Sequence, residues 1–165
     1  MKTKLIGIIA IALAISSNAQ ARPGETEAQV ASRYGVAAGS QPVTGHDVLG
    51  NEQRSYHFRN YIVIVTFENG ESICEDIRKQ AEKTSEKLLQ RNDVDSLLAD
   101  YTAAGVIWKR DPNGGGWDSA DGKLRARKGP SVLRIYNPAY GIQLAAFAKR
   151  KADESYFGLS KKPRP

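Results

Sequence analysis

The sequence predicts an α+β protein: two tandem units, each a helix followed by an antiparallel β-meander, forming one small domain with a C-terminal helix. Three observations support this fold class. Residues 61–78 place two runs rich in β-branched and aromatic residues around Asn69-Gly70, the dipeptide that favours a two-residue β-hairpin. Residues 92–104 carry apolar side chains at helical spacing. The order of helix and strands then occurs twice, over about 24–78 and about 92–154.

The hairpin sets the expected arrangement of the first unit. With a two-residue loop, Val65 pairs with Cys74 and Thr66 pairs with Ile73. Residues 55–58 predict a further strand, so that 55–78 form three antiparallel strands. Residues 36–51 are rich in Gly, Ser, Pro and Asn, which predicts a loop.

Each unit begins with a helix. In the first, Thr26 and Gln29 have capping-box spacing, and Gly35 marks the end of the helix. In the second, Asn92 is the expected N-cap. A single apolar stripe follows it, which should face the core, at Val94, Leu97, Leu98 and Tyr101.

The second half predicts more strands and a final helix. The strands are expected at 106–109, from Trp117, at 124–128 and at 132–136, with Asp121-Gly122 as a second hairpin turn. Asn137-Pro138 predicts the start of a helix that runs to about residue 154. Because Gly141 is a poor helix former, a strand over 142–148 is the alternative.

The first segment has the pattern of an export signal. Two lysines precede an apolar run over residues 5–15, and Ala19-Gln20-Ala21 is a cleavage pattern of small residues. The run is short for a membrane anchor, which is the alternative. We therefore predict a signal peptide at 1–21, a single domain at 22–159, a disordered basic tail at 160–165, and no transmembrane span after cleavage. The protein is expected to be secreted or periplasmic.

Charge and composition limit the function classes. The chain carries 24 Lys and Arg against 18 Asp and Glu, and two of the lysines lie in the signal. This modest excess, together with export, argues against a nucleic-acid partner. One cysteine, Cys74, excludes an internal disulfide and is expected to be a buried, inert residue of the hairpin.

No residue pattern defines a catalytic centre, a metal site or a cofactor site. His46 and His57 are the only histidines, and they lack the three or four ligands in register that zinc requires. A Cys74–His57 nucleophile and base pair has no orienting third group. The glycine run at 114–116 is not followed by the residues of a phosphate-binding loop.

A basic sheet face is the candidate binding surface. Lys123, Arg125 and Arg127 alternate along one predicted strand and share a face. The ordinary solvated face of an antiparallel sheet is the alternative interpretation. As the binding residues for an anionic surface or an acidic partner, we single out Trp108, Trp117, Arg125, Arg127 and Arg134.

The first unit resembles the SmpA/OmlA (BamE-like) family. The matching positions are Gly24, Thr26, Gln29, Val30, Gly35, Tyr56, Phe58 and Phe67, followed by Asn69-Gly70. The tandem arrangement is similar to the β-lactamase-inhibitor protein fold. The chain departs from the family at Ala37, where a proline is usual, and lacks its lipid-attachment cysteine. The resemblance implies a small exported α+β module that binds macromolecules, and it carries over no catalytic residues.

These observations together predict a non-enzymatic module that binds a macromolecule. Its partner would be another envelope or secreted protein, or an anionic surface, in envelope assembly or in the inhibition of an exported enzyme. The alternative is a small exported hydrolase that uses Cys74 and His57 or a histidine-centred metal site.

Overall fold

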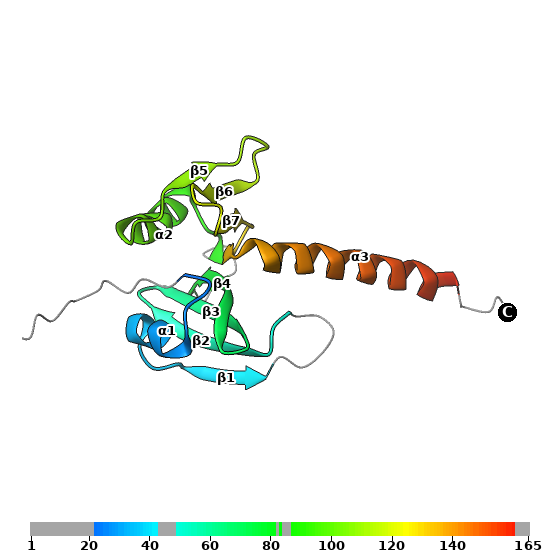
Figure 1. The fold of residues 1–165 in the computed structure, drawn as a ribbon, viewed down its shortest axis with the longest axis horizontal. Helices are drawn as coiled ribbons and strands as arrows, with labels where there is room; N and C mark the ends of the chain where they lie inside the picture. The colour runs from blue at the N-terminus through cyan, green and yellow to red at the C-terminus, as the bar shows by residue number, and fades with distance from the viewer. Residues whose placement is uncertain (1–21, 43–48, 82, 84–86, 161–165) are drawn as a thin grey trace, which may run out of the picture.

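The fold was obtained as a computed structural model that describes residues 22–42, 49–81, 83 and 87–160 (Figure 1). Within these ranges the helices are α1 (Glu27–Tyr34), α2 (Arg91–Ala103) and α3 (Pro138–Ser160). The strands are β1 (Gly39–Pro42), β2 (Glu52–Phe58), β3 (Tyr61–Glu68), β4 (Glu71–Lys79), β5 (Trp108–Arg110), β6 (Gly116–Ser119), β7 (Arg125–Lys128) and β8 (Leu133–Tyr136). The predicted signal peptide, His46 and residues 161–165 of the predicted tail lie outside the described residues.

The described strands form one antiparallel eight-stranded sheet, in the order β1-β2-β3-β4-β8-β7-β6-β5. The α+β class and the C-terminal helix are therefore confirmed. The division into two tandem units needs correction, because β4 pairs with β8 through Asp76 and Arg134 among other residues. The two runs of strands are halves of a single sheet and not separate meanders.

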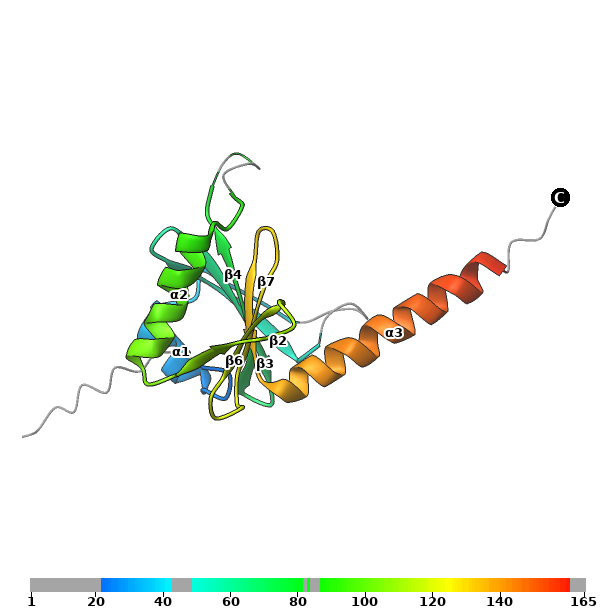
Figure 2. The same ribbon diagram turned by 90° about the horizontal axis from the view of Figure 1, so that it is seen from above.

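The two sides of the sheet differ in what covers them. Helices α1 and α2 lie on one side, and α3 starts on the other side and then leads away from the body (Figures 1 and 2). The main core lies under α1 and α2, where Val30 and Leu97 are buried against strand residues such as Val63 and Ile135. A smaller cluster under the start of α3 contains Ile73, Cys74, Tyr136 and Tyr140.

An irregularity in the β3–β4 hairpin changes the predicted register. The turn itself is as predicted, because Asn69 and Gly70 both have positive φ, at 54° and 83°. Phe67 pairs with Ser72 but Thr66 pairs with Cys74, so Ile73 has no partner of its own. This extra residue is a β-bulge, and it shifts every later pair by one. Glu75, instead of Cys74, is thereby paired with Val65 on the face that α1 and α2 cover.

Several predicted boundaries also differ. The loop predicted at 36–51 contains the edge strand β1, which pairs with β2. Helix α2 has Gln90 as its N-cap rather than Asn92, because the Asp93 carboxylate accepts a hydrogen bond from the Gln90 backbone N–H (2.8 Å).

The C-terminal segment is a helix, as predicted, and extends beyond residue 154. Gly141 is accommodated for a packing reason: a Cβ there would lie 2.7 Å from the ring of Tyr136. No helix in the described ranges is long and apolar enough to cross a membrane.

Candidate functional site

An open groove of about 690 Å³ runs between α2 and the edge strands β5 and β6. Its strand side is lined by Trp108 and Trp117, and its helix side includes Leu98 and Ala99. We call this hollow, with its continuation past Trp117, the tryptophan groove. Both indoles are partly buried against the main core, so each presents a fixed aromatic surface.

Local structure fixes the position of both tryptophans. Trp108 packs edge-on against Tyr101 of α2, with ring centroids 6.0 Å apart. Trp117 pairs with Ala126 of β7 on one side and with Arg110 of β5 on the other. Since paired residues of adjacent antiparallel strands point to the same face, Arg110 lies beside Trp117 on the α2 side of the sheet.

The groove continues past Trp117 as a second hollow of about 400 Å³, lined in part by Arg91, Arg110 and Lys128. Its only carboxylate is Asp95, which lies 3.7 Å from Arg91 in an exposed ion pair. Arg110 and Lys128 form no hydrogen bond or ion pair through their side chains within the described part of the chain. This end of the groove therefore has unneutralised positive charge.

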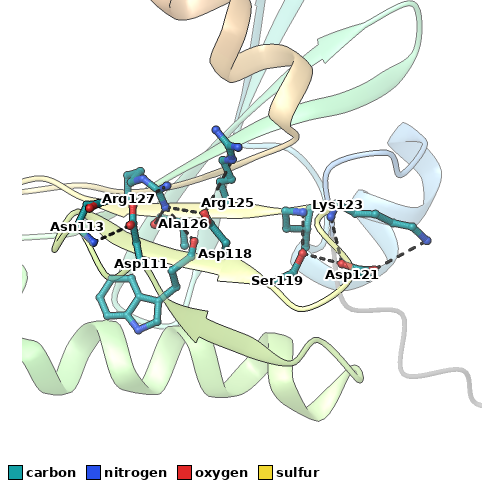
Figure 3. Close-up of polar contacts among 11 residues, drawn as sticks. Asp111, Asn113, Asp118, Ser119, Asp121, Lys123, Arg125, Ala126 and Arg127 are labelled. Atoms are coloured by element: carbon teal, nitrogen blue, oxygen red, sulfur yellow. Dashed lines mark hydrogen bonds and ion pairs between the residues drawn. The ribbon is translucent and has the colours of Figure 1, made fainter.

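The predicted arginines lie on the opposite face of the sheet from the tryptophans. The registers of β6, β7 and β8 place Arg125, Arg127 and Arg134 on the face away from α2. Arg127 donates to the Trp117 carbonyl and to Asp118 (both 3.0 Å) and lies 3.3 Å from Asp111 (Figure 3). The structure thus divides the predicted site between two surfaces.

Carboxylates are paired with Arg125, Arg127 and Arg134 on that opposite face. Arg134 donates to both oxygens of Asp76, at 2.6 and 2.7 Å, and this hydrogen-bonded carboxylate raises the pKa of the Arg134 guanidinium above its ordinary value. Arg125 is more exposed and lies 3.9 Å from Asp118. A ligand anion would have to compete with these carboxylates, which makes the face a weaker anion receptor than its sequence indicates.

A buried carboxylate that the sequence analysis missed lies at the centre of the sheet. Glu75 is 0% exposed and accepts hydrogen bonds from the hydroxyls of Tyr34 of α1 (2.9 Å) and Tyr101 of α2. Arg33 approaches its other oxygen at 3.8 Å. Burial, followed by the nearby Glu75 charge, raises the pKa of both tyrosines well above the ordinary value. The bulge at Ile73 carries Glu75 inward, and no local pattern in the sequence indicates that bulge.

The residues of the alternative catalytic proposal are not brought together. Cys74 is 2% exposed, and burial followed by the nearby Asp76 charge raises the pKa of its thiol. His57 is exposed and pairs with Ile62, whereas Cys74 pairs with Thr66, four residues further along β3. This offset alone amounts to roughly 13 Å. In the described ranges no three His, Cys, Asp or Glu residues are grouped so as to hold a metal ion.

Comparison with protein-family models, with curated proteins and with solved structures found no match to this chain.

Proposed function

We propose that this chain is an exported, non-enzymatic binding module that recognises a partner protein through the tryptophan groove. The observation that carries the proposal is the pair of partly buried indoles, Trp108 and Trp117, that line one open groove. Tryptophan and arginine are enriched among the residues that contribute most to protein–protein affinity, and such residues occupy concave, well-packed positions. The groove combines both residue types, because Arg110 lies beside Trp117.

The cellular setting of the proposal comes from the sequence. The basic start, the short apolar run and the Ala19-Gln20-Ala21 pattern support secretion or a periplasmic location. Among the roles open to such a module, we propose envelope assembly or inhibition of an exported enzyme. Membership of the SmpA/OmlA (BamE-like) family is part of the same proposal. The Thr26–Gln29 capping box and the positive φ of Gly35 support this membership, because both belong to the residue pattern that resembles the family.

The hydrolase alternative has less support. An enzyme that used Cys74 would need an accessible thiolate and a nearby base. The burial of Cys74 and its separation from His57 along the sheet weigh against that mechanism.

The decisive experiment is affinity capture with residues 22–165, followed by measurement of the affinity for the recovered protein. Trp117→Ala should weaken binding by at least about tenfold, as expected for a central aromatic anchor. Val36→Ala is the matched control, because Val36 is an exposed apolar residue (92%) of the segment that links α1 and β1, away from the groove. Circular dichroism should show that both variants are folded. A captured protein that binds Trp108→Ala and Trp117→Ala as well as the unchanged chain would contradict the proposal.

A further inference from the structure

We infer that the occupant of the tryptophan groove is an acidic peptide segment that lies in extended form along β5. This inference depends on the proposed function and specifies the chemistry of the partner. It draws on three separate features: the charge of the groove, the open edge of the sheet, and the alternation of side chains along a strand.

The charge of the groove favours an acidic ligand. Arg91, Arg110 and Lys128 line it against a single carboxylate, Asp95, which gives a net charge of +2. Two of these cations, Arg110 and Lys128, have no side-chain partner in the described part of the chain. By contrast, Arg127 and Arg134 on the opposite face are held by Asp118 and Asp76. Positive charge that an incoming carboxylate can use is therefore located in the groove.

The edge strand offers backbone partners to the same ligand. Strand β5 is the last in the sheet and pairs on one side only, with β6. The Ile107 carbonyl accepts from the Ala120 N–H (2.7 Å), and the Asp111 N–H donates to the Gly116 carbonyl (2.9 Å). Because hydrogen-bonding direction alternates along an antiparallel strand, the backbone groups of Trp108 and Arg110 point away from β6. An added extended segment would pair with these groups.

Side-chain alternation joins the edge to the groove. In a segment added to β5, every second side chain faces the α2 side, where the side chains of Trp108 and Arg110 also lie. An apolar side chain there would contact the indoles, and an acidic side chain two residues away would meet Arg110, the cation that β5 itself places on that face. The preferred sequence thus has acidic and apolar residues at alternate positions on one face of the segment.

The test uses a short fluorescent peptide in which two glutamates alternate with two leucines. With this repeat, each face of the extended peptide presents both acidic and apolar side chains. We expect its binding to weaken as salt is raised, and to weaken about tenfold in Arg110→Glu. Lys109→Glu is the matched control, because it makes the same charge change on the same strand. Lys109 lies opposite Asp118 in the strand register, and its side chain points to the face away from the groove. A lysine-substituted peptide should bind far more weakly, and backbone N-methylation should abolish binding.

Three results would overturn the inference. They are equal effects of Arg110→Glu and Lys109→Glu, unchanged binding of the N-methylated peptide, and binding of an anionic polysaccharide in place of the acidic peptide. Failure here is distinct from failure of the proposed function. A captured protein that needs Trp117 but tolerates Arg110→Glu would leave the binding module in place and reject only the acidic, extended partner.

Discussion

Glu75 is the residue at which the two covering helices meet the sheet. Tyr34 of α1 and Tyr101 of α2 both donate to its buried carboxylate, and Arg33 approaches it at 3.8 Å. Burying a carboxylate is costly unless hydrogen-bond donors satisfy it, and the two tyrosine hydroxyls supply these donors. Glu75 therefore adds a polar contact from each covering helix to the apolar packing, and its contact with α2 lies behind one wall of the tryptophan groove.

We expect Glu75→Leu to lower the free energy of unfolding by about 3 kcal/mol, because it leaves the buried hydroxyls of Tyr34 and Tyr101 without their acceptor. Tyr34→Phe, which removes one donor, should cost about 1 kcal/mol. Urea unfolding followed by circular dichroism measures both values. Combining Glu75→Leu with Tyr34→Phe and Tyr101→Phe should recover part of the loss. If Glu75→Leu alone proved as stable as the unchanged protein, the carboxylate would have no structural role.

At the scale of single elements, the sequence correctly predicted those features that depend on residues close together in the chain. The Asn69-Gly70 turn, the buried stripe of α2 and the helix after Asn137 are set by nearest-neighbour chemistry. Strand β1 and the bulge at Ile73 depend on pairing with distant residues, so the sequence pattern did not reveal them. The inward turn of Glu75 and the division of tryptophans and arginines between two faces follow from such pairings.

Helix α3 has two parts with different surroundings. Tyr140 is buried against Tyr136, with ring centroids 5.9 Å apart, and Leu144 packs on the same cluster. Further along, the side chains from Ala148 to Ala152 are exposed, and the helix leads away from the sheet (Figure 2). The first turns therefore contribute to the stability of the fold, and the exposed stretch 148–152 contributes little to it.

We expect deletion of residues 153–165 to change the melting temperature by no more than about 2 °C, because the packed part of α3 stays intact. Tyr140→Ala should lower the free energy of unfolding by about 3 kcal/mol, which corresponds to roughly 6–12 °C for a domain of this size. Differential scanning calorimetry on both variants separates the two parts of the helix. A large loss of stability in the truncated chain would show that the distal turns pack on the body.

At the scale of the whole molecule, the sheet separates two surfaces with different electrostatic character. On the α2 side, the groove has aromatic walls and cations without partners, Arg110 and Lys128. On the other side, Arg127 and Arg134 are neutralised by neighbouring carboxylates. Counting charges in the sequence could not distinguish these surfaces, because ion pairing depends on which strands are neighbours. The tertiary fold thus makes one face suited to an acidic partner.

At the same scale, the predicted export of the protein can be tested by identifying the first residue of the mature chain. We expect the exported chain to begin at Arg22, because Ala19-Gln20-Ala21 follows an apolar run of suitable length for signal cleavage. Cleavage there would leave Arg22 close to the start of the fold, where its backbone carbonyl accepts a hydrogen bond from the Ser72 hydroxyl (3.0 Å). Mass spectrometry of the protein from the envelope and the medium identifies the first residue. Substitution of Ala21 by a bulky residue should block processing, and a mature chain that still began at Met1 would refute the export signal.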